Sequence, residues 1–150
     1  YDAELTENYC GAVDANGNPE TVCASAQAPD GTRLPVTADY KGNLTARYTF
    51  DIGSMEAYWQ GSVVHEGRRT SDLRILERNI LGDLPAYTLT DFSLGVRRDS
   101  WSVDFFIKNL LDENAQYGRN VQCPETVCAA QVYSVAAQPR TFGIKFSQEF

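Results

Sequence analysis

The regular alternation of apolar and polar side chains is the feature that most constrains how this chain can fold. In Trp101–Lys108 the odd-numbered residues are Trp, Val, Phe and Ile, whereas the even-numbered residues are mostly polar. Because successive side chains of a β-strand point to opposite faces of a sheet, this segment predicts a strand with one apolar face. The same pattern predicts strands over residues 43–51, 55–65, 90–97 and 141–150, with a further candidate over residues 1–8.

The connections between these strands alternate in length. Residues 51–54 and 98–100 form tight turns, whereas about residues 9–41, 66–87 and 111–140 form long loops. Short turns at one end and long loops at the other are typical of bacterial outer-membrane β-barrels, with the short turns in the periplasm. A soluble sandwich of two antiparallel sheets shows the same alternation, so it remains the alternative.

Composition excludes several other classes of protein. No segment approaches the ~20 consecutive apolar residues that a membrane-spanning helix needs. The formal net charge of -7, with no basic stripe, argues against nucleic acid as a partner. The only histidine, His65, has no recognisable serine or cysteine partner, and no glycine-rich phosphate loop is present, so we predict neither an enzyme nor a cofactor.

The four cysteines fall in two Gly-, Asn- or Pro-containing stretches, and the simplest pairing joins Cys10 with Cys23 and Cys123 with Cys128. A zinc site is the alternative, but the spacing lacks two short CxxC knuckles and His65 is remote. Disulfides would indicate an oxidising compartment. The hexapeptide P-E-T-V-C-A occurs in both stretches, and it suggests a disulfide-pinned turn.

Arginines in the second long loop are candidates for binding an anionic ligand or lipopolysaccharide phosphates. A solvated loop is the alternative. The candidate ligand-binding residues, including two from the last long loop, are Arg68, Arg69, Arg74, Arg78, Tyr117 and Arg119.

Two motifs lie close to the C-terminal end of the chain. K-N-L-L-D-E over residues 108–113 ends one strand, and Q-P-R-T-F-G-I over residues 138–144 opens the strand that runs to Phe150. A further motif lies upstream, where L-P at 34–35 leads to K-G-N-L at 41–44. The order and spacing of these motifs resemble the C-terminal end of TonB-dependent outer-membrane receptors. The resemblance covers nearly the whole chain. The plug domain and the TonB-contacting segment of that family are absent, and Gln148 replaces its usual aromatic or apolar residue.

The resemblance implies an all-β fold, with residues 1–150 supplying about six antiparallel C-terminal transmembrane strands of a barrel of ~22 strands. Six strands are too few to close a barrel, whose smallest versions have about eight. We therefore expect this chain to be the last six strands of a larger barrel. Because the sequence begins with Tyr1 and shows no basic segment followed by an apolar one, we also expect that a signal peptide was removed or that the chain is part of a longer one.

The implied function is the import of a scarce ligand, such as a siderophore, cobalamin or a saccharide, across the outer membrane of a Gram-negative bacterium. The implied partners are membrane lipid and lipopolysaccharide, the remaining barrel strands and plug, TonB and the barrel-assembly machinery. The alternative is a secreted or surface β-sandwich that binds a ligand or self-assembles. The resemblance assigns the terminal assembly signal to Phe142, Ile144, Phe146 and Phe150.

Overall fold

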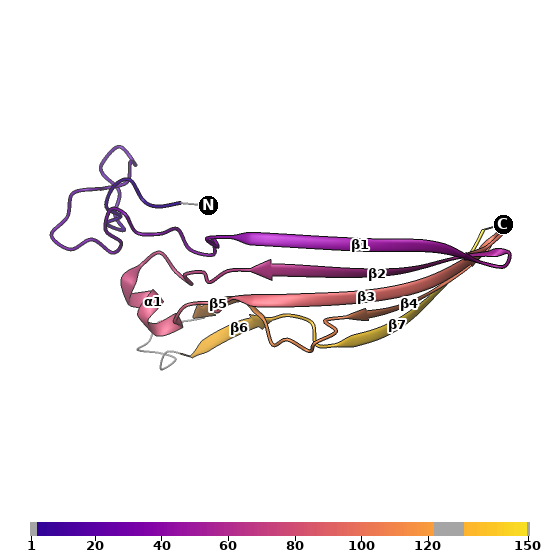
Figure 1. Cartoon of the computed structure of the whole chain (residues 1–150). Coiled ribbons are helices and arrows are strands. Elements are labelled where there is room, and N and C mark those ends of the chain that lie inside the picture. Colours follow the sequence, from indigo (N-terminus) through magenta and orange to yellow (C-terminus); the bar gives the residue numbers. More distant parts are fainter. Residues whose placement is uncertain (1–2, 122–130, 150) are drawn as a thin grey trace. The chain divides into compact units, whose positions relative to one another are not determined.

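Antiparallel β-sheet makes up most of the regular structure, with one short helix (Figure 1). The computed structural model describes residues 3–121 and 131–149. The all-β, antiparallel prediction is confirmed. The elements are β1 (Lys41–Ile52), β2 (Met55–Glu66), α1 (Ile75–Leu81), β3 (Tyr87–Arg98), β4 (Trp101–Lys108), β5 (Gln116–Val121), β6 (Val132–Ala136) and β7 (Thr141–Gln148).

The chain divides into two compact units. The sheet unit comprises Lys41–Glu66, Tyr87–Ala115 and Ala137–Phe150. The loop unit comprises Tyr1–Tyr40, Gly67–Ala86 and Gln116–Ala136.

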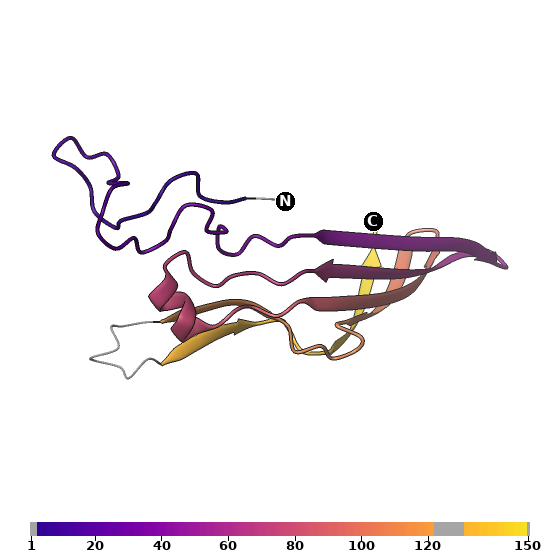
Figure 2. The same ribbon diagram turned by 60° about the vertical axis from the view of Figure 1, so that its left-hand side comes forward.

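The sheet unit contains a single five-stranded sheet in the order β1-β2-β3-β4-β7, in which all neighbours are antiparallel. The predicted strand Trp101–Lys108 has the bounds that the alternation gave, and β1, β2 and β3 extend one to three residues beyond theirs. The last strand ends at Gln148, two residues before the predicted end. Figure 2 shows the sheet bending, so that β4 and β7 turn away from the plane of β1 and β2.

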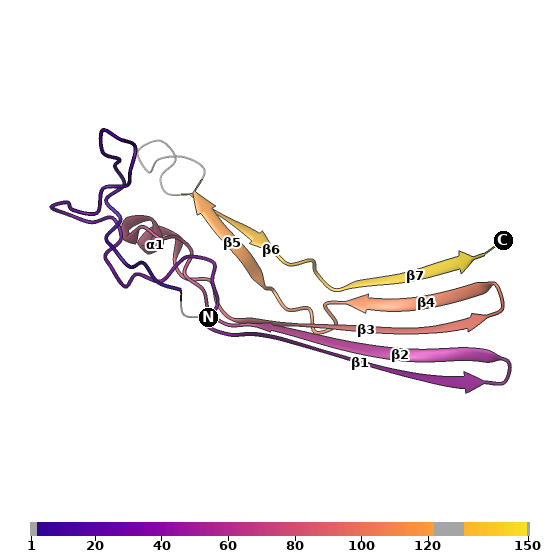
Figure 3. The ribbon, with the colours of Figure 1, turned by 90° about the horizontal axis from the view of Figure 1, so that it is seen from above.

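Two-residue turns connect β1 to β2 and β3 to β4. Ile52 pairs with Met55 across the first turn, and Arg98 pairs with Trp101 across the second. The first turn residue has a positive φ in both cases, 64° at Gly53 and 50° at Asp99, as the tight turns of β-hairpins require. Both turns lie at the same end of the sheet (Figure 3).

The loop unit has more regular structure than the sequence predicted. The last long loop contains the antiparallel hairpin of β5 and β6, and the second long loop contains α1. The predicted strand over residues 1–8 is wrong for its described part, where Glu4 forms only an isolated bridge with Arg33. A short alternation without a neighbouring strand of matching length cannot form a ladder. No described helix is long and apolar enough to cross a membrane.

Burial differs between the two units. In the loop unit Ala28 and Leu84 are completely buried, and Leu81 is nearly so. In the sheet unit the buried apolar residues are Ala57, Tyr87 and Ala115, whereas most of the large apolar side chains are exposed or half-buried. The sheet therefore contains strands with well-defined pairing but little core.

Candidate functional site

One face of the sheet is apolar across all five strands, and we call it the apolar face. The strand register aligns the apolar positions of each strand, so the alternation of single strands becomes a continuous surface. Leu44 is 71% exposed and Ile144 is 75% exposed. The three rows that cross all five strands are Phe50-Ala57-Val96-Val103-Phe146, Tyr48-Trp59-Leu94-Phe105-Ile144 and Ala46-Gly61-Phe92-Ile107-Phe142.

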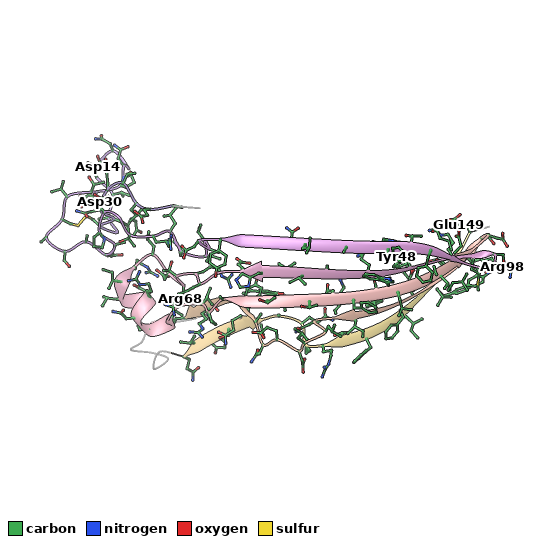
Figure 4. The ribbon with its side chains drawn as sticks, viewed as in Figure 1. Asp14, Asp30, Tyr48, Arg68, Arg98 and Glu149 are labelled. Atoms are coloured by element: carbon green, nitrogen blue, oxygen red, sulfur yellow. A yellow bond between two sulfur atoms is a disulfide. The ribbon has the colours of Figure 1, made fainter. Side chains whose placement is uncertain are left out.

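Aromatic rings cluster on this face beside the β1 edge. The Tyr48 and Phe50 rings stack with centroids 5.6 Å apart, and the Trp59 ring lies 6.1 Å from that of Tyr48 (Figure 4 labels Tyr48). Tyr48 remains 57% exposed and Trp59 44% exposed. Exposed apolar patches of this extent are uncommon on soluble monomers, and they usually mark a protein or membrane contact.

The apolar face has two polar margins. Beyond Leu44 the next row on the same face contains Gly42, His65 and Thr88, and the His65 Nδ1 lies 2.8 Å from the Thr88 hydroxyl. At the other end of the sheet, Trp101 pairs with Arg98 and Gln148. Gln148 therefore lies at a margin where polar groups are already present.

The opposite face is mostly polar and holds a connected set of side chains, which we call the polar face. The Tyr58 hydroxyl donates a hydrogen bond to the Asp104 carboxylate at 2.7 Å. The Arg47 guanidinium carbon lies 3.6 Å from the centre of the Tyr58 ring, a cation–π contact. These contacts connect β1, β2 and β4. The alternation in the sequence predicts the face on which each residue lies, but it does not predict these contacts.

Two glycines on the polar face lie beneath aromatic rings. A Cβ atom at Gly95 would approach Tyr58 Cε1 to 2.6 Å, and one at Gly143 would approach Phe106 Cε1 to 2.7 Å. Real Cβ atoms do not come this close, so a larger residue at either position would force the neighbouring ring to shift. Phe106 is the one large apolar residue that breaks the alternation of β4, and its cross-strand partner Gly143 accounts for it.

Shallow hollows lie along the polar face. One of about 300 Å³ is lined by Arg97, Asp104 and Lys145 among others, and one of about 230 Å³ adjoins it at Arg47 and Tyr58. Charges of both signs line these hollows, so the polar face is suited to contact with water or with a polar polypeptide. It shows no excess of one charge that would select a particular small ion.

The two motifs behind the family resemblance meet in one hydrogen-bonded corner. The buried Asn109 side chain donates to the carbonyl oxygens of Glu113 and Gln138, each at 2.9 Å. The Asp112 carboxylate accepts the backbone N–H of Arg140 at 2.9 Å. Asn109 and Asp112 have φ angles of 51° and 58°, a conformation that Asn and Asp tolerate better than most residues. These motif residues therefore hold the end of β4 beside the start of β7.

The predicted arginine cluster lies in the loop unit, where its members have different partners. Arg68 lies 3.9 Å from an Asp83 carboxylate oxygen (Figure 4 labels Arg68). Arg74 forms ion pairs with Asp72 at 3.2 Å and with Glu77 at 2.8 Å. These carboxylates offset the positive charge that an anionic ligand would require, so binding of an anion by these residues stays a prediction.

Two other members of the cluster hold backbone carbonyl groups. Arg69 is buried and donates to the carbonyl oxygens of Gln116 and Tyr117, at 2.8 and 3.3 Å. Arg119 donates to the last carbonyl of α1, at Leu81, at 2.9 Å. Arg69 and Arg119 therefore link Gly67–Ala86 to β5, with Tyr117 contributing a backbone atom. The remaining member, Arg78, lies within α1, and its carbonyl accepts the Gly82 N–H.

Two carboxyl groups of the loop unit, those of Asp14 and Asp72, have a lowered pKa. The backbone N–H of Asn18 lowers the pKa of Asp14, with a second backbone hydrogen bond from Asn16. Burial acts to raise the pKa of Asp72, but the hydrogen bonds from Arg74 outweigh it and lower that pKa. The same hydrogen bonds raise the pKa of Arg74. The Asp72–Arg74 pair therefore remains charged at every physiological pH.

Cys10 and Cys23 form a disulfide with the two Cα atoms 6.0 Å apart. Cys123 and Cys128 lie outside the described residues, as do Phe150 and the second P-E-T-V-C-A copy. Phe142, Ile144 and Phe146 of the predicted assembly signal all lie on the apolar face of β7, each more than 60% exposed.

No group of three or more His, Cys, Asp or Glu side chains suited to a metal ion is found within residues 3–121 and 131–149. Comparison with protein families, curated proteins and solved structures gave no match. The functional interpretation therefore depends on the two faces of the sheet and on the motifs themselves.

Proposed function

We propose that this chain forms part of the wall of an outer-membrane β-barrel in a Gram-negative bacterium, with the apolar face toward lipid and the polar face toward the lumen. The observation that carries the proposal is the apolar face, which is continuous over five strands and largely uncovered. Exposure of so many apolar side chains to water is unfavourable, whereas their contact with lipid hydrocarbon is favourable.

The dimensions of the apolar face support this proposal. From Leu44 to Ile52 the apolar positions of β1 span about 26 Å, at ~3.3 Å per residue. A strand tilt of ~40° would reduce this to roughly 20 Å across the membrane, close to the ~25 Å apolar band of such barrels. Trp101, at the margin of the apolar face beside the tight turn, is an aromatic residue of the kind that lines the interfaces of that band.

The connections support an orientation. The two-residue turns follow β1 and β3, whereas the connections after β2 and β4 pass through the loop unit. In bacterial barrels the short turns are periplasmic and the long loops extracellular. The Cys10–Cys23 disulfide in the loop unit suits the same orientation, because disulfides persist outside the cytoplasm.

We further propose, from the resemblance of the two C-terminal motifs, that the barrel belongs to a TonB-dependent receptor that imports a scarce ligand. The Asn109 and Asp112 side chains of the first motif form hydrogen bonds with the backbone of Gln138 and Arg140 in the second, between the end of β4 and the start of β7. A structural role of this kind gives the motifs a reason to occur together. The plug, the remaining strands, TonB and the assembly machinery would be the partners.

The test is whether the chain folds in water or in lipid. The full chain is refolded in plain buffer, in detergent micelles and in phosphatidylcholine vesicles, and strand formation is followed by circular dichroism and by tryptophan fluorescence. We expect Trp59 and Trp101 to be quenched by brominated lipid. A folded monomer in plain buffer, with no binding to vesicles, would favour the soluble β-sandwich instead.

A further inference from the structure

A hollow of about 350 Å³ lies within the loop unit, and the proposed barrel wall makes no use of it. Two segments that are far apart in sequence line the hollow: Ser25, Ala26 and Gln27 form one wall, and Arg74, Ile75, Leu76 and Glu77 form the other. Small-molecule sites have volumes of roughly 300–1,000 Å³. The hollow is at the lower end of this range, so it has room for a compact small molecule.

Hydrogen bonds and the disulfide hold the two walls in place. The Gln27 carbonyl accepts the Ile75 N–H at 2.9 Å, which ties one wall to the other. The Gln27 N–H donates to the Tyr9 carbonyl at 2.9 Å. The Cys10–Cys23 disulfide fixes the chain next to Tyr9 and just before the first wall. A site that is formed before its ligand arrives loses less conformational entropy on binding.

The charges beside the hollow do not cancel. Asp72 accepts hydrogen bonds from Arg74 Nε and Nη2 at 3.2 and 3.4 Å, and Glu77 Oε1 lies 2.8 Å from Arg74 Nη1. Two carboxylates facing one guanidinium leave a net charge of −1. The second oxygen of Glu77, Oε2, has no hydrogen-bond or ion-pair partner within residues 3–121 and 131–149. The surplus negative charge of the hollow therefore lies at Glu77.

Apolar side chains lie next to this carboxylate. Leu76 is 76% exposed and Ile75 is 36% exposed, and both line the hollow together with Ala26. An anion is disfavoured by the surplus charge, and by the formal charge of −5 that the eleven acidic and six basic residues give the loop unit. A metal ion requires several oxygen ligands, and the described parts of the chain hold no such group. An organic cation can use both the carboxylate and the apolar side chains.

We propose that this hollow binds a small organic cation, which consists of an ammonium group attached to a compact apolar body. The ammonium group lies at Glu77 Oε2, and the apolar body lies against Ile75 and Leu76. This ligand has the opposite charge to the one that the arginines of the second long loop predict. Arg74 positions Glu77 and does not itself bind an anion. The inference goes beyond the proposed barrel function and does not depend on the membrane location.

Three probes that share one apolar body test the charge of the ligand. The full chain is titrated with cyclohexylammonium, cyclohexanol and cyclohexanecarboxylate, in micelles or in buffer according to which medium the chain folds in. Nuclear magnetic resonance follows the backbone amides of residues 25–27 and 74–77. We expect cyclohexylammonium to bind roughly three- to fivefold more tightly than cyclohexanol, because it gains one partly exposed charge pair. The carboxylate should bind more weakly than either.

Two matched variants test whether Glu77 receives the ammonium group. Glu77→Gln should weaken cyclohexylammonium binding by roughly three- to fivefold and leave cyclohexanol binding unchanged. Glu20→Gln makes the same charge change at an exposed residue of the loop unit outside the hollow, and it should change neither affinity.

The inference is overturned if none of the probes shifts these amides, or if the carboxylate binds as tightly as the ammonium. Equal effects of the two variants on cyclohexylammonium binding would also overturn it, because the loop unit would then attract cations without a specific site. If Glu77→Gln alters the fold of the loop unit, the three probes on the unsubstituted chain still decide the question. Failure of the chain to bind vesicles would contradict the proposed barrel function alone.

Discussion

The sheet unit and the loop unit of this chain are stabilised in different ways. The sheet unit depends on a regular backbone ladder and has little core, and its large apolar side chains point away from the protein. The loop unit has little ladder, but it holds completely buried side chains, a disulfide and arginines that bind backbone carbonyls.

The two units also differ in formal charge. The loop unit contains eleven acidic and six basic residues, a formal charge of −5, whereas the sheet unit contains nine and seven, a formal charge of −2. The loop unit is held together by its own buried side chains, disulfide and hydrogen bonds, so it can remain hydrated and charged. The sheet has little core and needs an apolar surrounding. The proposed membrane location explains why the two units differ in this way.

A charge placed on the apolar face should have the largest effect, because it tests whether the sheet needs an apolar surrounding. Ile144→Arg should lower the free energy of unfolding from a bilayer by ~2–4 kcal/mol if the position lies near the midplane, because the charge must enter lipid. Unfolding by urea from vesicles measures the loss. Ser147→Arg, on the polar face of the same strand, is the control and should change stability by less than ~1 kcal/mol. Equal losses for both variants would argue against the assigned faces.

Removal of the disulfide should affect the loop unit and spare the sheet. The double variant Cys10→Ser, Cys23→Ser removes a disulfide between residues 13 apart in sequence. Its loss should lower the free energy of unfolding of the loop unit by about 3 kcal/mol, because the unfolded chain gains conformational entropy. Hydrogen exchange should become faster in residues 3–40 and remain unchanged in β2 and β3. Faster exchange throughout the sheet would show that the two units are not independently stabilised.

The glycines beneath aromatic rings offer a matched test within the sheet. Gly143→Ala should destabilise the sheet by roughly 1–3 kcal/mol, because the new methyl group would overlap the Phe106 ring. Gly61→Ala is the control, since no atom lies within 4 Å of a Cβ there, and it should change stability by less than about 0.5 kcal/mol. Chemical denaturation in detergent measures both. A second change, Phe106→Leu, should recover part of the Gly143→Ala loss if the overlap is its cause.

The smallest expected effect is the acid sensitivity of the loop unit. Hydrogen bonds from Arg74 lower the pKa of Asp72 in the folded state. Its contribution is therefore fully present above the unfolded pKa of ~3.9 and is lost as the pH falls through the lower folded pKa. Since both side chains are partly exposed, we expect less than about 1 kcal/mol. Hydrogen exchange of residues 72–78 between pH 2 and 6 should show this loss, and Asp72→Asn should remove the pH dependence.

Much of the sheet could be predicted from the sequence, because a strand's alternation is a local property. The bounds of β4 and the membership of each face follow from period two alone. The same reasoning could not find β5 and β6, whose residues alternate weakly and whose pairing depends on a partner about 15 residues away. Nor could it assign the arginines, since Arg69 and Arg119 find backbone carbonyls rather than a ligand only once Gly67–Ala86 and β5 come together.

The sequence by itself determined that this protein would form antiparallel strands with one apolar and one polar face, because side-chain direction alternates with every residue. Only the tertiary structure decided that the apolar positions of five strands align into one surface, since register depends on which strands pair and on the turns between them. It also decided that Asn109 and Asp112 form hydrogen bonds with Gln138 and Arg140, which are distant in sequence. Contacts of this kind are set by the path of the whole chain, and no local pattern encodes them.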